Sequence, residues 1–269
     1  MTGLKGARVL IVGASAGIGQ ETGLAAAKAG AKVAFAARRV DKLEELVAQA
    51  GGGCAIPLDV RDEASIADGV ARAVDHLGGL DAVVHSAGTA RMGTLADENA
   101  ERWREVLETN VIGAALVAQQ VIPHLAASPL GVMLFCSSTS DDQPRWGLSA
   151  YAVSKAALNR LVEELRHEHR DVRFIRTTIG STIGTEFGNN FDGEILMQAL
   201  AQWVVSAQAT AKMMTAPDLG AVLSELLDML LRHPDVDMPQ LSLEPPGGTM
   251  TLPATPDMLT KFYESMPAS

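Results

Sequence analysis

The chain is poor in cysteine, in aromatic residues and in positive charge. Only two of its 269 residues are cysteine, and neither lies in a Cys-x-x-Cys or Cys/His spacing, which argues against a disulfide framework and a cysteine-based metal site. Cys54 and Cys136 are expected as buried thiols in strands. Lys and Arg number 22 against 32 Asp and Glu, a formal net charge of −10. We therefore expect no nucleic-acid or anionic-membrane partner, because phosphate-rich partners demand a basic face.

Long apolar runs and a leader segment are also missing. The chain does not open on a charged segment followed by an apolar core, and no apolar run approaches the ~18 residues that cross a bilayer. We therefore expect a cytoplasmic protein that does not contact a membrane. His167 and His169 are two residues apart, which places them on different faces of a helix, so we expect no metal site there either.

What the sequence does contain is a regular alternation of short apolar strands and longer helical stretches. Runs that are apolar throughout, such as residues 132–135, are typical of parallel strands covered on both faces. At this length, with 47% hydrophobic residues, we expect a single α/β domain: a Rossmann-type, doubly wound parallel sheet of about seven strands with helices on both faces. The expected strands are residues 8–12, 32–36, 54–58, 80–86, 131–137, 172–178 and 238–243. The expected helices are residues 17–29, 41–50, 62–76, 99–125, 149–169 and 217–232.

The predicted domain spans residues 1–243 and a tail spans 244–269. Within the domain, residues 185–215 form an apolar, helical flap. The tail is rich in proline up to residue 256 and contains a short helix candidate at 256–266. We expect the tail to cover a neighbouring subunit.

Tyr151 and Lys155 lie four residues apart on a predicted helix, and Ser138 precedes Tyr151 by thirteen residues. This spacing places a phenol and an ammonium on one helix face, where the cation can stabilise the phenolate. The free phenol has a pKa of about 10, so the neighbouring cation would bring it towards neutrality and make it a proton donor for a carbonyl. Because Tyr-x-x-x-Lys also arises by chance, the motif needs support from elsewhere in the chain.

That support is a glycine-rich turn between the first strand and the first helix. Gly13 lets the chain turn sharply, Gly17 lets backbone amides approach a pyrophosphate, and Gly19 lets the helix lie close to the sheet. The exposed amides and the helix dipole then form an anion site. The spacing is Gly-x-x-x-Gly-x-Gly, and such a turn taken alone is as often a structural feature as a cofactor loop.

Arg38 and Arg39 follow the second strand, where a nicotinamide-binding fold meets the adenosine ribose. A carboxylate there would accept a hydrogen bond from a ribose 2′-hydroxyl, whereas a guanidinium suits a 2′-phosphate. No carboxylate precedes the two arginines, so we favour NADP over NAD. The alternative is that both arginines only solvate the start of the second helix.

In this order, the glycine-rich turn, Asn110 in Thr-Asn-Val, Ser138 and Tyr151-x-x-x-Lys155 resemble the classical short-chain dehydrogenases/reductases. The resemblance covers residues 4–243, and the four motifs together are highly specific. It implies hydride transfer between a nicotinamide and a carbonyl or secondary alcohol, with Tyr151 donating or removing the proton.

The resemblance also implies a role for each of the other catalytic candidates. Lys155 lowers the Tyr151 pKa and hydrogen-bonds the nicotinamide ribose. Ser138 holds the substrate oxygen near the phenol, although its alternative is a strand-terminal hydroxyl that satisfies backbone groups. Asn110 holds a water that connects Lys155 to solvent.

Further cofactor contacts follow from the resemblance. Asp59 meets the adenine amino group and the Val60 backbone helps to hold the ring, although a helix cap or turn is an equally strong interpretation of Asp59. Ile183 and Thr185 are assigned to the nicotinamide amide. The remaining contacts come from the glycine-rich turn and the end of the fourth strand: Ser15, Ile18, Ser86, Ala87 and Gly88.

The chain departs from the family pattern at three places. Val12 stands where a Thr is usual, His85-Ser86 replaces Asn-Asn, and Ile179 replaces a Pro. The first two departures remove both partners of a polar contact between the first and fourth strands. We expect packing or Ser86 to replace this contact, with consequences for cofactor affinity and local stability.

Substrate identity depends on the variable regions, residues 141–148 and 185–215. The apolar residues of the second region and Trp146 favour a moderately bulky, apolar carbonyl or alcohol, although such a stripe more often packs against its own domain. Residues 111–125 are apolar on more than one face, which together with the resemblance predicts a homodimer or homotetramer; coverage by the chain's own loops is the alternative. The competing function class is a non-catalytic NADP(H) sensor or scaffold, which would not need Tyr151 and Lys155.

Overall fold

The expected strands form one parallel sheet. The structure is a computed structural model that describes residues 3–249. The sheet has the order β3-β2-β1-β4-β5-β6-β9, and each neighbouring pair is parallel. The predicted Rossmann-type fold is confirmed, and each strand end lies within two residues of its expected position. The strands are β1 Arg8–Val12, β2 Lys32–Ala37, β3 Cys54–Pro57, β4 Ala82–His85, β5 Val132–Ser138, β6 Arg173–Ile179 and β9 Gln240–Leu243.

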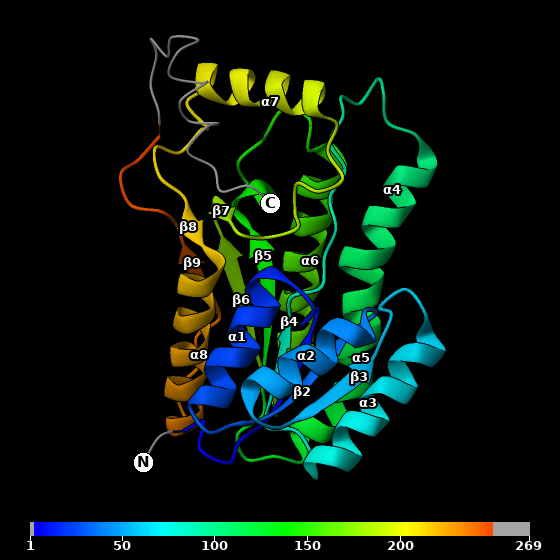
Figure 1. The fold of residues 1–269 in the computed structure, drawn as a ribbon, viewed down its shortest axis with the longest axis vertical. Helices are drawn as coiled ribbons and strands as arrows, with labels where there is room; N and C mark the ends of the chain where they lie inside the picture. Colours follow the sequence, from blue (N-terminus) through cyan, green and yellow to red (C-terminus); the bar gives the residue numbers. More distant parts are fainter. Residues whose placement is uncertain (1–2, 250–269) are drawn as a thin grey trace.

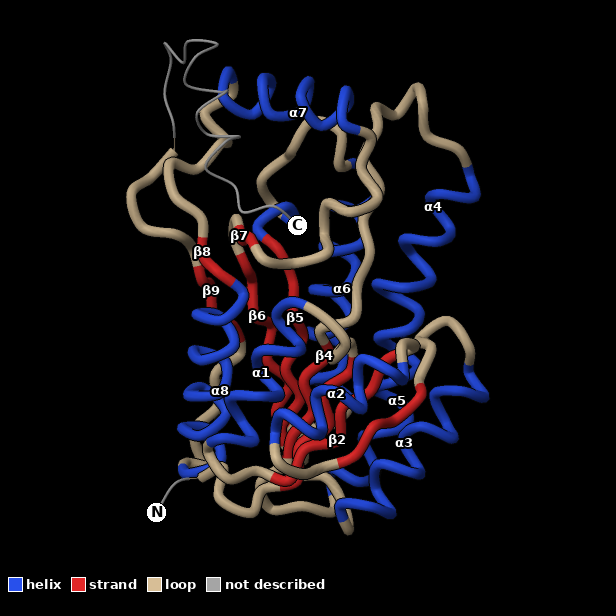
Figure 2. The backbone as a smooth tube through the Cα atoms, viewed as in Figure 1, coloured by secondary structure: helices blue, strands red, loops and turns tan. Residues whose placement is uncertain are grey.

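Helices cover both faces of this sheet (Figure 1). One face carries α1 (Gly17–Lys28), α2 (Val40–Ala50) and α8 (Ala216–Arg232). The other carries α3 (Glu63–Leu77), α5 (Gly113–Ala126) and α6 (Ser149–Glu168). Figure 2 shows the strands running between these helix layers.

The apolar strands feed two separate cores. In β1, Val9 and Ile11 pack into the cluster beneath α1 and α8, whereas Leu10 and Val12 pack into the cluster beneath α3 and α5. Successive side chains of a strand point to opposite faces, so a sheet buried on both sides needs apolar residues at every position. This is the physical reason for the unbroken apolar runs in the sequence.

The helix expected over residues 99–125 is interrupted. The α-helix α4 (Ala100–Leu107) is followed by one π-helical turn, η1 (Glu108–Ile112), and then by α5. A single π-turn can interrupt an α-helix while the residues before and after it keep the helical spacing of apolar side chains. The apolar spacing in the sequence therefore does not reveal the turn. The interruption places Asn110 in the π-turn.

This helical run also corrects the expectation about long apolar segments. Within the described residues, Ala100–Ala126 is long and apolar enough, by length and composition alone, to cross a membrane. Its side chains Val117, Val121 and Leu125 are fully buried against the sheet. One face of the run therefore packs against the sheet, while 39% of its most apolar 18-residue window is buried.

A small layer covers the carboxyl ends of the strands. It contains α7 (Gly193–Val205) and a two-stranded sheet of β7 (Thr182–Ile183) and β8 (Met214–Thr215), while η2 (Thr139–Asp141) follows β5 directly. Figure 1 shows α7 lying across this end of the molecule. The predicted flap at 185–215 contains α7, and the β7–β8 pair was not predicted. The helix candidate at 256–266 lies outside the described residues.

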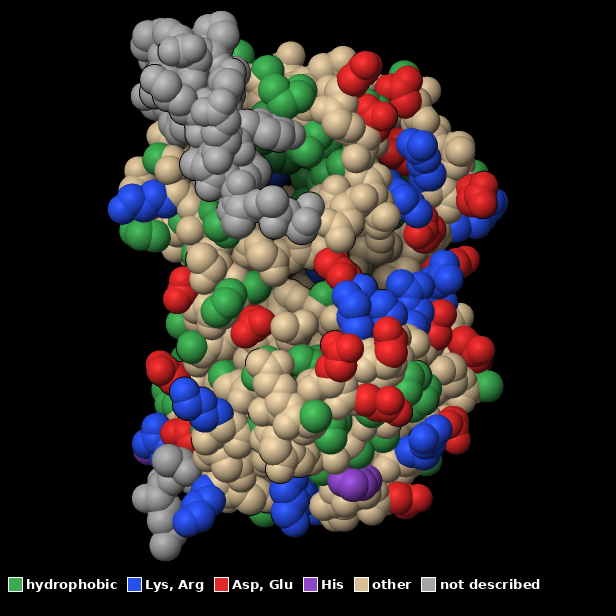
Figure 3. All heavy atoms as spheres, in the orientation of Figure 1, with side chains coloured by type: hydrophobic (Ala, Val, Ile, Leu, Met, Phe, Trp, Pro, Cys, Tyr) green, Lys and Arg blue, Asp and Glu red, His purple; other side chains and the backbone are tan. Residues whose placement is uncertain are grey.

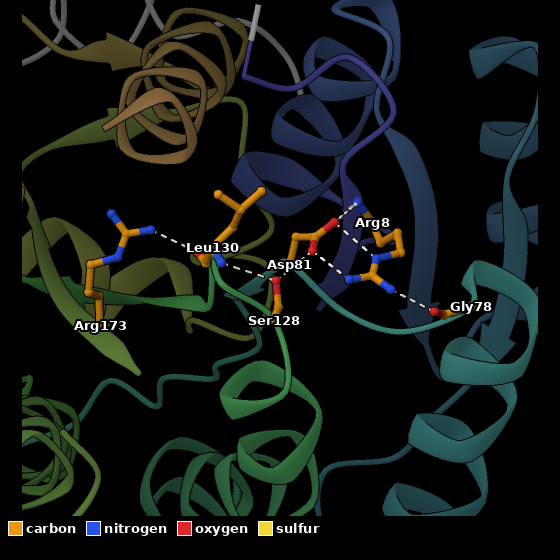
Figure 4. Close-up of polar contacts among 6 residues, drawn as sticks. All are labelled: Arg8, Gly78, Asp81, Ser128, Leu130 and Arg173. Atoms are coloured by element: carbon orange, nitrogen blue, oxygen red, sulfur yellow. Dashed lines mark hydrogen bonds and ion pairs between the residues drawn. The ribbon is translucent and has the colours of Figure 1, made fainter. Parts of the chain in front are cut away.

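At the opposite end of the sheet, Asp81 joins the starts of several strands (Figure 4). Its carboxylate accepts hydrogen bonds from the backbone and guanidinium of Arg8 and from the Ser128 hydroxyl, at 2.6–3.0 Å. Arg173 reaches the same region by donating to the Leu130 carbonyl at 2.7 Å. Burial alone would raise the Asp81 pKa, but these donors outweigh it and the pKa is lowered.

Candidate active site

The glycine-rich turn has the geometry of an anion cradle. Gly13 and Gly17 have φ angles of +87° and +56°, in the region that favours glycine. A Cβ atom on Gly13 would lie 2.5 Å from the Ala87 nitrogen, and one on Gly19 would lie 2.4 Å from the Gly13 oxygen. The α1 helix begins after Ala16, which provides no side-chain cap, so its first amides remain available. These features fit the pyrophosphate of a dinucleotide.

The predicted catalytic residues come together beside this turn. Ser138 ends β5, and Tyr151 and Lys155 lie on the first turns of α6. The Lys155 ammonium lies 5.6 Å from the centre of the Tyr151 ring. The Ser138 hydroxyl lies close enough to the phenol to favour its ionised form. All three side chains are at least nine-tenths buried.

The expected depression of the Tyr151 pKa does not occur in this arrangement. Burial raises the pKa of the Tyr151 phenol to about 12, and the nearby Ser138 hydroxyl offsets this only in part. Phe187 lies against the ring edge-on, with 5.0 Å between the ring centres, and contributes to this burial. The Lys155 Nζ is held by the Cys136 carbonyl, to which it donates a hydrogen bond at 2.8 Å.

Lys155 is itself affected by burial. Burial lowers the pKa of its ammonium to about 8, so the group remains mostly protonated at neutral pH. A Cβ on Gly88 would lie 3.6 Å from the Lys155 Nζ and 3.4 Å from the Asn110 Oδ1. The loop after β4 therefore passes directly beside both side chains.

Asn110 fastens this loop to α6. Its Nδ2 donates to the Thr89 carbonyl and the Ser154 hydroxyl, both at 2.9 Å, and its Oδ1 accepts from the Thr89 amide at 2.8 Å. Both amide protons are engaged, so a water near Asn110 would have to donate to one of its oxygens. In this structure the side chain holds its neighbours in position.

The two arginines after β2 differ in their surroundings. Arg38 is exposed, whereas Arg39 turns towards the glycine-rich turn. The Arg39 Nη2 donates to the Ser15 Oγ at 2.9 Å and Nε donates to the same atom at 3.2 Å. The guanidinium also forms a two-pronged ion pair with Glu186, at 2.7 and 2.8 Å. Arg39 is therefore the arginine that lies against the glycine-rich turn.

Asp59 and Val60 occupy the turn after β3. The Asp59 Oδ1 accepts from the Arg61 amide at 3.0 Å, which makes Asp59 a turn residue in this structure. The cap of α3 is Asp62 instead. Val60 is buried against the start of α5, where a Cβ on Gly113 would lie 2.6 Å from the Val60 carbonyl oxygen.

Packing replaces the polar contact that the family usually has between the first and fourth strands. Val12 is paired with His85 in the parallel register, and both are 1% exposed. The His85 ring stacks on Phe135 with 5.9 Å between centres. Ser86 contributes a backbone bond, its amide donating to the Val12 carbonyl at 2.8 Å.

The third departure lies at the end of β6. Ile179 is buried and pairs in register with Leu243, and the next amide, of Gly180, donates to the Leu243 carbonyl at 2.8 Å. This pairing holds the chain against β9 where it leaves the sheet. The following segment then rises over the glycine-rich turn.

That segment brings further predicted residues to the site. Ile183 lies in β7, paired with Thr215, and a Cβ on Gly17 would lie 3.3 Å from the Thr185 side chain. The flap then covers Tyr151. Phe187 packs edge-on against the phenol ring, and Phe191 packs against Phe187 with 5.2 Å between the ring centres. The apolar cluster around Tyr151 also includes Met92, Leu148, Ala199, Trp146 and Trp203.

Sequence reasoning did not identify two residues of this site. Glu186 and Phe187 were part of the flap region, but neither was assigned a contact with the arginine or the phenol. Glu186 directly follows Thr185, which is one of the residues expected at the cofactor. This adjacency is the one signal in the sequence for an acidic partner of Arg39.

The comparisons with known proteins identify the family. The sequence model of the short chain dehydrogenases matches residues 7–192, more than half of the chain. A short chain dehydrogenase of Pseudocercospora fijiensis is 37% identical over 171 residues, which are 61% of this chain and 55% of that protein. The chain therefore matches about half the length of this relative.

Solved structures of similar fold extend over most of the chain. A short-chain type dehydrogenase/reductase from Mycobacterium marinum is 27% identical, with a TM-score of 0.76 over 90% of this chain and 95% of that one. An alcohol dehydrogenase from the archaeon Thermococcus sibiricus, complexed with 5-hydroxy-NADP, is 25% identical, with a TM-score of 0.74 over 87% and 94%. The expected family is confirmed: the chain belongs to the short chain dehydrogenases, a family of NAD(P)-dependent oxidoreductases.

Proposed function

We propose that this protein is an NADP-dependent oxidoreductase that uses Tyr151 as general acid and base on a carbonyl or secondary alcohol. The dinucleotide-binding and catalytic unit is residues 1–243, with residues 185–215 as a movable cover. The proposal is carried by one observation: Ser138, Tyr151 and Lys155 are buried together beside a glycine-rich turn whose amides are uncapped.

Each residue has a task that follows from its position. When bound, the nicotinamide supplies or accepts the hydride. Tyr151 transfers the proton at its phenol oxygen, and the Ser138 hydroxyl donates a hydrogen bond to the substrate oxygen. Lys155 is held by the Cys136 carbonyl and places its ammonium beside Gly88, where it can donate to a ribose hydroxyl. Asn110 holds the loop after β4 in place through its hydrogen bonds with Thr89.

The protonation state of Tyr151 matters for both directions of the reaction. A phenol with a pKa of about 12 is protonated at neutral pH, the form that donates a proton to a carbonyl, whereas oxidation of an alcohol requires the phenolate.

The test compares matched variants in NADPH oxidation with a panel of ketones. Tyr151→Phe should bind NADPH but lose about 10²- to 10⁴-fold in turnover, because the proton donor is gone. Ser138→Ala should lose about 10²-fold, whereas the adjacent buried Ser137→Ala should retain turnover. Persistent turnover in Tyr151→Phe would contradict the proposal. Tight NADPH binding without turnover of any ketone would favour the sensor.

The preference for NADP rests on Arg39. Its guanidinium lies against Ser15 at the mouth of the glycine-rich turn, and the Thermococcus sibiricus neighbour was solved with an NADP derivative. Arg39→Gln should weaken NADPH binding by about 10- to 100-fold and leave NADH binding nearly unchanged, since a charge-assisted hydrogen bond is lost. Arg38→Gln is the matched control and should have the smaller effect. Equal losses for both cofactors would contradict the assignment.

The substrate, assembly and location are also part of the proposal. The cluster around Tyr151 is apolar, so the substrate is an apolar ketone or aldehyde of moderate size that enters when the flap moves. Ile112 and Val153, on neighbouring helical segments, are 52% and 48% exposed and support a homodimer or homotetramer through this face. The protein is expected to act in the cytoplasm.

A further inference from the structure

The Arg39 guanidinium already binds an anion of the chain itself. Glu186 presents both carboxylate oxygens to the two terminal nitrogens of Arg39, at 2.7 and 2.8 Å. Lys42, from the first turn of α2, lies 3.5 Å from the same carboxylate. Figure 3 shows Lys and Arg side chains gathered in the region of α2, with carboxylates beside them.

This pairing uses the groups that a cofactor phosphate would need. A carboxylate and a phosphate bind the guanidinium fork in the same two-pronged way, so the two anions exclude one another at its terminal nitrogens. The contact between Arg39 and Ser15 fixes the guanidinium beside the glycine-rich turn. The inference rests on the proposed function, which places a 2′-phosphate at Arg39.

Glu186 also lies between two other contacts of the flap. The preceding residue, Thr185, packs over Gly17, where a Cβ would be 3.3 Å away. The following residue, Phe187, packs on the Tyr151 ring. Three consecutive residues therefore span the site from the arginine at one end to the phenol at the other.

We propose that Glu186 is a cofactor-specificity residue that competes with the 2′-phosphate of NADP(H) for Arg39, and that its displacement releases Phe187 from Tyr151. NADH has no 2′-phosphate and leaves the ion pair in place. The flap consequently opens over the phenol only for the phosphorylated cofactor.

The strength of the ion pair suits this role. The side chains of Arg39 and Glu186 are 38% and 42% exposed, so solvent screens their attraction and a doubly charged phosphate can replace the carboxylate. The Arg39 guanidinium lowers the pKa of the Glu186 carboxyl through hydrogen bonding, so Glu186 stays ionised to lower pH than an ordinary glutamate.

The test measures cofactor dissociation constants by fluorescence titration of the intact chain. Glu186→Gln removes the competing charge and should lower the Kd for NADPH by about threefold to fivefold, with the Kd for NADH unchanged. Glu194→Gln is the matched control: it lies exposed on α7, eight residues away, and should change neither value.

A second measurement reports on the flap without any cofactor. Backbone hydrogen exchange over residues 185–191 should be faster in Glu186→Gln than in wild type or Glu194→Gln, because the flap loses its contact with Arg39. The inference would be overturned if the ratio of the Kd for NADPH to the Kd for NADH were the same in Glu186→Gln as in wild type. It would also be overturned if Glu186→Gln weakened the binding of NADH alone. Failure of the wild type to bind either nucleotide would instead overturn the proposed function.

Discussion

His85 is a buried imidazole that the structure keeps neutral. It is 1% exposed, its ring stacks on Phe135, and its Nε2 has no partner among the described residues. Burial, assisted by the nearby Lys155 ammonium, lowers the pKa of His85 to about 3. Below pH 6.5 His85 is protonated in the unfolded chain but stays neutral in the folded chain. The free energy of unfolding therefore falls as the pH is lowered from 6.5 towards 3.

We predict that His85→Asn, which restores the residue usual in the family, flattens this acid dependence. The wild type should lose about 1.4 kcal/mol of unfolding free energy per pH unit below 6.5 through this residue alone. Urea unfolding between pH 7 and 5 measures the slope. The exposed histidine of α3 provides the control, because His76→Asn should leave the slope unchanged. Parallel slopes for wild type and His85→Asn would refute the assignment.

Tyr151 and Phe187 illustrate how one ring controls the acidity of another. Burial raises the Tyr151 pKa, so removing the ring that covers it should lower that pKa towards the ordinary value of about 10. We predict that Phe187→Ala shifts the tyrosinate absorbance titration to lower pH, with the Tyr151→Phe variant identifying the signal. Phe191→Ala, one ring further from the phenol, should shift it less. A titration unmoved by Phe187→Ala would show that other groups bury the phenol.

Residue patterns predicted that the three candidate catalytic residues lie together, but not which side chains surround them. Ser138, Tyr151 and Lys155 were found because a helix places residues four apart on one face and a strand end precedes them. The choice between Arg38 and Arg39 could not be made, since it depends on which way the chain leaves β2. The Arg39–Glu186 pair joins positions 147 residues apart, and no local pattern records such a contact.

At the scale of elements, α1 and α8 pack at unusually short range. A Cβ on Gly220 of α8 would lie 2.4 Å from the Glu21 Cβ and 2.8 Å from the Thr22 nitrogen of α1. Because α1 carries the glycine-rich turn at its start, its distance from α8 also sets the position of the anion cradle. The glycine in α8 therefore links helix packing to the cofactor site.

We predict that Gly220→Ala forces α1 away from α8. Overpacking at this contact should cost about 1–3 kcal/mol of unfolding free energy and should raise the Kd for NADPH. Gly193→Ala is the matched control, because a Cβ there meets no atom within 4 Å and its effect should stay within about 0.5 kcal/mol. Calorimetry and fluorescence titration measure the two quantities. An undiminished melting temperature in Gly220→Ala would show that the helices tolerate a wider spacing.

Periodicity predicted the elements well and their irregularities poorly. The strands of the sheet were recovered because every position is apolar, and the capped helix starts at Asp62 and Thr215 agree with the expected boundaries. The π-turn at Asn110 was not predicted, because residues on either side keep a helical apolar spacing. The β7–β8 pair has two residues per strand, too few to show an alternation.

For the whole molecule, the face formed by η1, α5 and α6 is the expected site of self-association. Ile112 and Val153 expose large apolar side chains there, and solvent exposure of both is costly unless another surface covers them. We predict that the double substitution of Ile112 and Val153 by Glu lowers the molecular mass found by analytical ultracentrifugation. Val222→Glu, on α8 at the other face of the sheet, should leave the mass unchanged. A mass unaltered by the double substitution would place the interface elsewhere.

The position of β1 in the centre of the sheet constrains the order in which the polypeptide can fold as it is synthesised. β1 is made first, yet it pairs on one side with β2 and on the other with β4, whose register with β1 joins Val9 to Ala82. A nascent chain can therefore form a three-stranded half-sheet early, with β1 as a bare apolar edge. That edge stays open until residues 82–85 leave the ribosome, so during this interval the apolar β1 strand is exposed to incorrect pairing.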